Sequence, residues 1–178
     1  MLAHMSDRRA ARTRAALLQA FGALMRQGRR SIRVADVVEE ANVGRSTFYE
    51  HFSGADDLHM AALSRPFALL ADAATGRADA ERLAGLLDHF RENKHRARET
   101  LSGRTGEQAA RLLAALIEER LPPALPPEEV RLAAAQLSGA ALAAVGAWVR
   151  GETGLSSNAV AAAICRSSAA AVRVLAAG

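Results

Sequence analysis

The sequence predicts an all-α protein with about nine helices, and three observations point to this class. Hydrophobic residues make up 50% of the 178-residue chain, but 42 of them are alanine, and only 4% of all residues are aromatic. Alanine is the strongest helix former and adds little buried area, so this composition favours closely spaced helices. Isoleucine and threonine are scarce, and no stretch alternates with a period of two, which argues against a mainly β fold.

The first predicted helix carries apolar residues at helical spacing from Thr13 onward. Leu17, Phe21 and Leu24 recur on one side, as in an amphipathic helix. Gly28 follows this pattern, at a place where glycine commonly takes the left-handed conformation that ends a helix. Residues 6–14 are polar and basic.

Two short helices are predicted next, over residues 34–41 and 45–52. A tight turn at Asn42-Val43-Gly44 joins them, and Phe48 and Phe52 lie four residues apart on the second. Three helices in the first 52 residues, of which the last two are short and joined by a tight turn, have the dimensions of a helix-turn-helix unit.

Breaks divide the rest of the chain into longer segments. Ser53-Gly54 and Thr75-Gly76 interrupt the helical pattern, and four prolines between residues 122 and 127 form a rigid loop. The predicted helices span 55–74, 79–93, 106–120, 130–150 and 156–176, with a basic stretch over 91–98 between two of them. This order predicts a helix-turn-helix domain over residues 8–58 and a second helical domain over residues 59–178.

The positive charge is concentrated near the N-terminus. The chain has a net charge of +4 and a sequence pI of about 10.4. Up to residue 55 there are nine basic and five acidic residues, so this segment carries the whole surplus. Only Lys94 among the 23 basic residues is lysine, and arginine suits phosphate and carboxylate partners. A genomic composition bias is the alternative explanation for the arginines.

A lone cysteine and one long uncharged stretch bear on the cellular location of the protein. Cys165 leaves no partner for an intrachain disulfide, which fits a reducing cytosol. Residues 132–149 are uncharged over 18 positions, a length at which a transmembrane helix has to be considered. Eight of these residues are alanine, and Arg131 and Arg150 close both ends. We therefore interpret the stretch as a buried helix of a soluble, cytoplasmic protein without membrane contact.

The third predicted helix presents many hydrogen-bonding side chains, while Phe48 and Phe52 anchor its back. The hydrogen-bonding side chains are Arg45, Ser46, Thr47, Tyr49 and His51. Arginine can bond guanine in the major groove, hydroxyl groups can bond phosphates, and the positive end of a helix adds attraction for the phosphates. The alternative interpretation is an ordinary solvated surface helix.

Residues 12–58 also carry a distinctive series of motifs. The series reads Arg12-Thr13-Arg14, Gly28, Asp36-Val37, Ala41-Asn42-Val43-Gly44-Arg45-Ser46-Thr47-Phe48-Tyr49-Glu50-His51-Phe52 and Leu58. It resembles the tetracycline-repressor (TetR) family of bacterial transcriptional regulators, most specifically in the Thr-Phe-Tyr-x-His-Phe run after an Ala-x-Val turn. The match covers about a third of the chain, and the rest agrees with the family in layout only.

The resemblance implies a homodimer that binds a palindromic double-stranded DNA operator and usually represses transcription. A small, mostly apolar ligand in the second domain would release the DNA. Carried over by position, the helix-turn-helix spans Arg33–Phe52. Residues 45–47 would face bases and phosphates, and Tyr49 and His51 would contact mostly phosphate. The implied DNA contacts are Thr13, Arg14, Arg33, Gly44, Arg45, Ser46, Thr47, Tyr49 and His51.

Four positions depart from the family pattern. Arg33 stands where a capping Thr or Ser is usual, so it can replace a phosphate contact but not the cap. Asn42 replaces the turn glycine and tolerates left-handed geometry. Gly44 replaces a serine, and Ala55 replaces a lysine that would contact phosphate.

The last two predicted helices have faces of small residues. In residues 130–150, Ala135, Gly139, Ala143 and Gly146 fall on one side, and residues 156–176 are similarly rich in alanine. Small residues let another helix approach closely, and in the TetR family the last two helices form the four-helix bundle of the dimer. We therefore expect these helices to make the homodimer; the alternative is that both faces pack within one chain.

Bulky apolar side chains of the second domain are candidates for a ligand pocket or for its core. They are Phe67, Leu70, Leu83, Leu86, Leu87, Phe90, Leu113, Leu116, Ile117 and Trp148. No cofactor or metal site is expected, because the sequence has one cysteine and no His-x-x-x-His. No nucleophile–base pair or phosphate loop indicates an enzyme. The alternative function is a DNA-binding regulator without a small-molecule ligand, controlled by a protein or constitutive.

Overall fold

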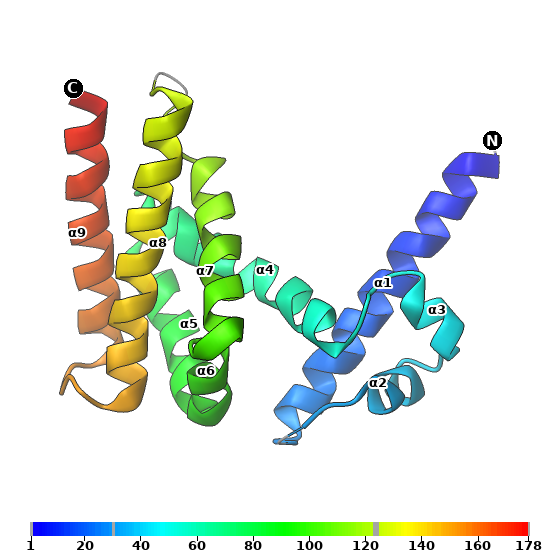
Figure 1. Ribbon diagram of the computed structural model, residues 1–178. Helices are drawn as coiled ribbons and strands as arrows, with labels where there is room; N and C mark the ends of the chain where they lie inside the picture. The colour runs from blue at the N-terminus through cyan, green and yellow to red at the C-terminus, as the bar shows by residue number, and fades with distance from the viewer. Residues whose placement is uncertain (1, 30, 123–124, 178) are drawn as a thin grey trace. The chain divides into compact units, whose positions relative to one another are not determined.

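The computed structural model describes residues 2–29, 31–122 and 125–177, and all regular structure in these ranges is helical (Figure 1). The described helices are α1 (Leu2–Arg26), α2 (Val34–Glu40), α3 (Arg45–Tyr49), α4 (Ala55–Ala74), α5 (Ala80–Glu92), α6 (Lys94–Thr100), α7 (Gly103–Glu118), α8 (Pro127–Arg150) and α9 (Ser157–Ala177). The predicted all-α class and the predicted number of helices are confirmed. The chain forms two compact units, and the boundary between Leu63 and Ser64 falls inside α4.

One hydrophobic core holds the first unit together. It consists of Leu17, Ala20, Phe21, Leu24, Val37, Phe48, Phe52 and Leu58. These residues come from α1, α2, the α3 segment and the start of α4. The apolar spacing after Thr13 therefore identified the buried face of α1. Gly28 follows the helix with a φ of 73°, as the sequence predicted.

α1 begins much earlier than its apolar pattern. It starts at Leu2, whereas the sequence places the first amphipathic turn at Thr13. The side chains from Arg8 to Arg12 are exposed, so this part of the helix has no buried face to leave a periodic signal. Alanine and arginine are strong helix formers, and the segment contains neither proline nor glycine, so the helix continues through it.

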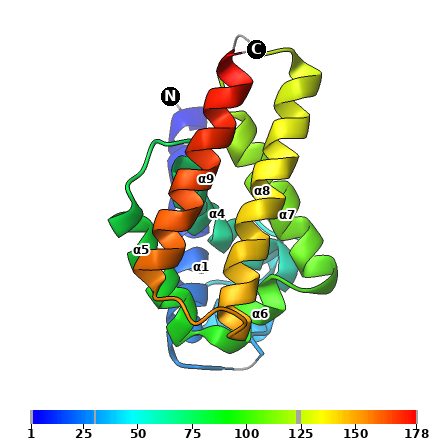
Figure 2. The same cartoon turned by 90° about the vertical axis from the view of Figure 1, so that its left-hand side faces the viewer.

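The second unit is a bundle in which α8 lies between α7 and α9 (Figures 1 and 2). α5 packs against α9, and α6 contacts both α7 and α8. The sequence did not predict α6, which takes up most of the basic stretch. This helix has only seven residues, and its buried side chains are Ala97 and Thr100, too few to produce a clear helical period.

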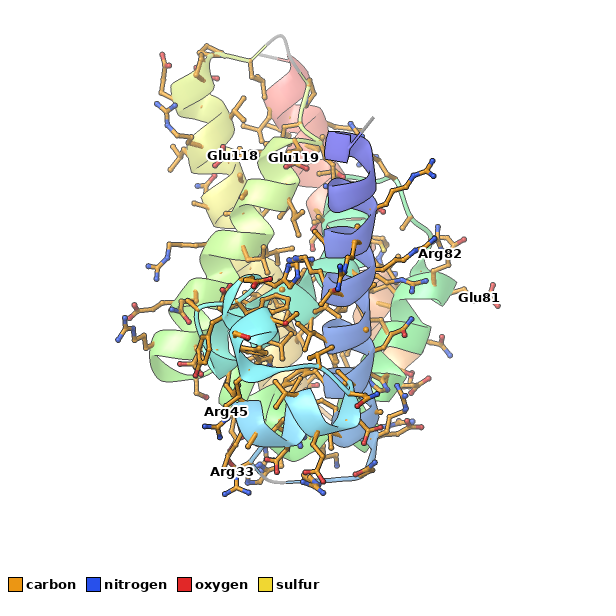
Figure 3. All side chains as sticks on the ribbon, turned by 90° about the vertical axis from the view of Figure 1, so that its right-hand side faces the viewer. Arg33, Arg45, Glu81, Arg82, Glu118 and Glu119 are labelled. Carbon is orange, nitrogen blue, oxygen red and sulfur yellow. The ribbon has the colours of Figure 1, made fainter. Side chains whose placement is uncertain are left out.

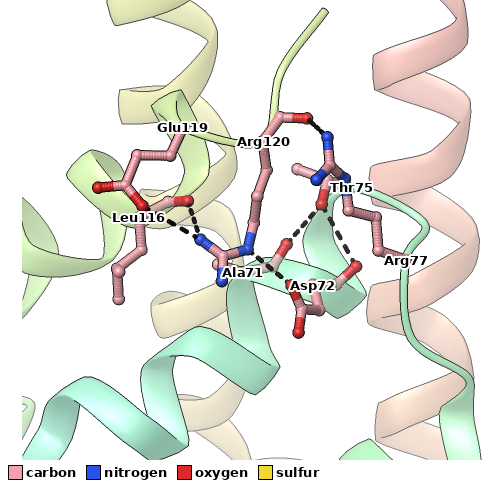
Figure 4. A network of polar contacts seen from close by, with 7 residues as sticks. All are labelled: Ala71, Asp72, Thr75, Arg77, Leu116, Glu119 and Arg120. Atoms are coloured by element: carbon pink, nitrogen blue, oxygen red, sulfur yellow. Dashed lines mark hydrogen bonds and ion pairs between the residues drawn. The ribbon is translucent and has the colours of Figure 1, made fainter.

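A polar network joins the end of α4 to the end of α7 (Figure 4). The Arg120 guanidinium donates from Nε to Asp72 Oδ1 at 2.6 Å and from Nη1 to the Leu116 carbonyl at 2.6 Å. Arg77, in the segment after α4, donates to the Arg120 carbonyl at 2.7 Å. The Arg120 side chain is only 16% exposed, so solvent screens this ion pair less than a surface pair.

α8 and α9 are both long and apolar enough to span a membrane, judged by length and composition only. In α8, half of the most apolar window is buried inside the protein. Ser138 donates its hydroxyl to the Ala110 carbonyl of α7 at 2.8 Å, and Trp148 donates its indole N–H to the Leu155 carbonyl at 2.9 Å. α8 is thus a central helix of the second unit, whereas only 22% of the most apolar window of α9 is buried.

Candidate nucleic-acid interface

α3 has one buried and one open face. Phe48 is completely buried, and its ring centroid lies 5.7 Å from that of Phe52 and 5.3 Å from that of Tyr49. Tyr49 is 58% exposed, and the side chains of Arg45 and Ser46 are also exposed. The two phenylalanines therefore anchor α3 from behind, as the sequence predicted, and leave its polar side chains free to meet a partner.

The turn before α3 sets where the helix starts. Asn42 has a φ of 52°, a left-handed conformation that asparagine accepts more readily than most residues. The Val43 amide then donates to the Val38 carbonyl at 3.0 Å, which closes the turn. Gly44 precedes the helix with extended backbone. The turn forms at Asn42 without the glycine that is usual in the family that this sequence resembles.

At the start of α2, Asp36 holds Arg33. The Asp36 carboxylate accepts the backbone N–H of Arg33 at 2.8 Å. The Asp36 backbone N–H, which the side chain of a capping Thr or Ser would accept, bonds the Arg33 carbonyl at 3.0 Å instead. It also pairs with the guanidinium groups of Arg33 at 3.3 Å and Arg29 at 3.2 Å. The hydrogen bonds from Arg33 are the main reason that the pKa of Asp36 lies below its usual value.

Two cations share this one carboxylate, so the start of α2 keeps a positive surplus. The Arg33 side chain is 78% exposed. Figure 3 shows Arg33 and Arg45 extending away from the helices of the first unit. An anionic partner such as a phosphate can reach both groups from solvent.

Thr13 and Arg14 of α1 both contact other residues of the first unit. The Thr13 hydroxyl donates to the Arg9 carbonyl, one turn earlier, at 3.1 Å. The Arg14 guanidinium lies 5.1 Å from the centroid of the Phe52 ring, within the range of a cation–π interaction. Arg14 thus ties α1 to the segment after α3.

A groove with a volume of about 590 Å³ runs between α1, the turn and α3. It is lined by Arg9, Ala10, Thr13, Asn42, Val43, Gly44, Thr47, Glu50 and His51. Four residues of the predicted DNA-contacting set, Thr13, Gly44, Thr47 and His51, come together here. The other five are not part of its lining: Arg14, Arg33, Arg45, Ser46 and Tyr49.

Arg9 and Glu50 are lining residues that sequence reasoning did not include. A signal for Arg9 existed in the sequence, because Arg9 stands four residues before Thr13, and residues at this spacing share one face of a helix. This spacing predicts a role for Arg9 only if the first helix is taken to begin before the apolar pattern that starts at Thr13. Glu50 lies inside the recognised motif, where its acidic charge gave no reason to expect a DNA contact.

In the second unit, the candidate ligand residues are mostly core residues. Seven are buried: Phe67, Leu70, Leu83, Leu87, Leu113, Ile117 and Trp148. Leu86, Phe90 and Leu116 are half-buried. Within the described ranges, no group of three or more His, Cys, Asp or Glu side chains is arranged to hold a metal ion.

The small-residue face of α8 is largely open. Ala135, Gly139 and Ala143 are exposed, whereas Gly146 is buried. On the same helix Leu132 is 63% exposed, and Val174 of α9 is 75% exposed. α8 and α9 therefore leave apolar surface uncovered in the single chain.

No protein-family profile matches the chain, and no curated protein sequence matches it. Solved structures do. A TetR transcriptional regulator from Streptococcus agalactiae superposes with a TM-score of 0.54 at 22% identity, over 93% of this chain and 98% of its own. The dihydroxyacetone kinase operon activator DhaS gives a TM-score of 0.52 at 20% identity, over 92% and 97%.

A third structure, RolR in complex with its ligand resorcinol, gives a TM-score of 0.49 at 25% identity, over 95% of both chains. The first two likenesses show that this chain shares the all-helical fold of these regulators.

Proposed function

We propose that this chain is a TetR-family transcriptional regulator that binds a palindromic DNA operator as a homodimer. One observation carries the proposal: α3 presents an exposed polar face from a buried aromatic anchor, in a fold shared with solved transcriptional regulators. The concentration of positive charge ahead of residue 55 supports it, because DNA carries a dense row of phosphates. We place the protein in the cytoplasm, because a protein with this function must have access to DNA.

In this proposal, the start of α3 enters the major groove. Arg45 and Ser46 are exposed in its first turn, where a guanidinium can bond both acceptors of a guanine. His51 and Tyr49 stand further along and bond phosphates. Arg33 adds a phosphate contact at the start of α2, and Asp36 keeps its guanidinium in place.

Replacing Arg45 by alanine is expected to relax base preference at one position of each half-site, at a cost of about 1–3 kcal/mol in discrimination. Replacing His51 by alanine is expected to weaken all duplexes alike, because a phosphate contact carries no base information. Competition binding with single-base variants of the selected duplex measures both effects. Uniform losses in both variants would contradict this division of roles.

Selection of bound duplexes from a random pool tests the proposal as a whole. The enriched sequences should contain two inverted half-sites about one helical turn apart. Their affinity should fall with salt by about 0.9 log units per log unit of salt for each phosphate neutralised. Because the neighbour DhaS is named an operon activator, a promoter reporter must be read in both directions; we propose repression.

The dimer is proposed to form through the uncovered faces of α8 and α9. The exposed small residues of α8 let the helix axes of two chains approach closely, and the exposed Leu132 and Val174 supply apolar area. Two such chains would place two copies of α3 on one palindrome, which a single chain cannot do.

We also propose that a small, mostly apolar ligand binds among the candidate residues of the second unit and releases the DNA. Thermal unfolding against a panel of metabolites is the measurement. A ligand present at 100 times its dissociation constant should add about 2.7 kcal/mol to the free energy of unfolding. A panel in which every compound leaves the transition unchanged would favour the alternative, a regulator controlled by a protein or constitutive.

A further inference from the structure

The N-terminal part of α1 extends beyond the hydrophobic core of the first unit. From Arg8 onward, the first fully buried side chain of α1 is Leu17, and the side chains from Arg8 to Arg12 are all exposed. A helical segment that buries nothing adds little to the stability of the fold. One side of this segment nevertheless forms a wall of the groove that faces α3, through Arg9, Ala10 and Thr13.

The groove combines donors on two walls with an apolar patch. Arg9 contributes a guanidinium from α1, and His51 contributes an imidazole from the end of the α3 segment. Thr47 adds a hydroxyl beside them, and Ala10 and Val43 add apolar surface. Cationic and neutral donors next to apolar carbon suit a sugar–phosphate chain, whose phosphates accept hydrogen bonds and whose sugars present carbon.

Arg9, like Arg45, has no side-chain partner among the described residues, whereas Arg14 and Arg33 do. Arg14 lies over the Phe52 ring, and Arg33 is bound to Asp36. For Arg9, no side-chain hydrogen bond or ion pair is found among the described residues, and its side chain is exposed. Its full charge is therefore available to an anion that enters the groove.

Glu50 is the single acidic residue among the nine that line the groove. A carboxylate repels a phosphate, so it restricts where the phosphate can lie. A phosphate in the groove is therefore expected to lie nearer to Arg9 than to Glu50. Removing the Glu50 charge should therefore change the affinity in the opposite direction from removing the Arg9 charge.

We infer that this groove seats the sugar–phosphate backbone of the DNA strand beside α3, with Arg9 as a phosphate-binding residue outside the helix-turn-helix. This inference rests on the proposed function. It adds a contact from a part of α1 that precedes the recognised motif, and it assigns Glu50 as the residue that limits backbone affinity.

The test compares Arg9→Ala with Arg8→Ala. Both positions are exposed on the same helix and lose the same charge, but Arg8 does not line the groove. Binding of a labelled duplex selected by the wild-type protein, and of a scrambled duplex, is measured across a salt series by fluorescence anisotropy. Circular dichroism checks that each variant keeps its helices.

For Arg9→Ala we expect affinity for both duplexes to fall by about tenfold for each bound subunit. The salt slope should drop by about 0.9 for each lost phosphate contact. Arg8→Ala should change the slope far less, and Arg9→Lys should retain most of it. Glu50→Gln should bind both duplexes more tightly than wild type. In an ethylation-interference experiment, ethylation of one phosphate should weaken binding by the wild-type protein and by Arg8→Ala. The same ethylation should have no effect on binding by Arg9→Ala.

Equal salt slopes for Arg9→Ala and Arg8→Ala would overturn the inference, because the Arg9 charge would then act through general electrostatic attraction and not through a phosphate bound in the groove. So would binding of inorganic phosphate that depends on Arg9 while duplex affinity does not, since the groove would then be a small-anion site. A wild-type protein that enriches no duplex is a different result and contradicts the proposed function itself.

Discussion

Replacing Ala143 by arginine is expected to split the proposed homodimer and to weaken binding to a palindromic duplex by about 10²- to 10⁴-fold. Ala143 is exposed on α8, in the row of small residues with Ala135 and Gly139. A long charged side chain there keeps the helices of two chains apart and leaves a charge in an apolar contact. The large loss in affinity arises because two linked half-site contacts become two separate ones.

Ala115→Arg is the matched control for this variant. Ala115 is also an exposed alanine, but it lies on α7, outside the proposed interface. Sedimentation velocity should show a dimer for wild type and for Ala115→Arg, and a single chain for Ala143→Arg. Binding to an isolated half-site should be similar in all three proteins. A wild-type protein that sediments as a monomer at micromolar concentration would contradict both the dimer and the palindrome.

Phe48→Ala is expected to have the largest effect on stability, about 3–5 kcal/mol. Phe48 is completely buried among the core residues of the first unit, next to Phe52. A unit of about 60 residues has only a small margin of stability. The loss should therefore unfold the first unit, and DNA binding should disappear with it.

Two spectroscopic signals can separate the units in this experiment. Trp148 is the only tryptophan, and it is buried in the second unit, so its fluorescence follows that unit. Circular dichroism follows the helices of both. In Phe48→Ala, part of the helical signal should be lost at lower urea concentration while the fluorescence midpoint stays in place.

Tyr49→Ala serves as the control, because Tyr49 is the next aromatic residue but is 58% exposed. It should leave both midpoints nearly unchanged and affect DNA affinity only. If fluorescence and circular dichroism shift together in Phe48→Ala, the two units unfold as one, and the prediction of a local loss is wrong.

The parts of the fold that could be predicted are those where burial leaves a pattern. Leu17, Phe21 and Leu24 mark the buried face of α1, and the Phe48–Phe52 spacing marks the back of α3. The left-handed residues Gly28 and Asn42 also stand where their sequence context placed them. In each case the information is local, because it concerns residues within one or two helical turns.

The remaining features depend on solvent exposure or on contacts between elements. In the extension of α1, the side chains from Arg8 to Arg12 are exposed, so no apolar period reveals this part of the helix, and the sequence did not predict a role for Arg9. The stacking of Arg14 on Phe52 joins residues far apart in sequence. The bond from Ser138 to the Ala110 carbonyl likewise requires the packing of α7 on α8.

The small side chains of α8 have a mechanical consequence. Ala133, Ala134 and Ala141 are buried on one side of this helix, and Ala135, Gly139 and Ala143 are exposed on the other. Alanine and glycine have no side-chain rotamers, so they cannot rearrange to absorb a displacement of a neighbouring helix. At these positions we therefore expect a displacement of α7 to be taken up by movement of the α8 backbone, since the side chains cannot rotate to absorb it.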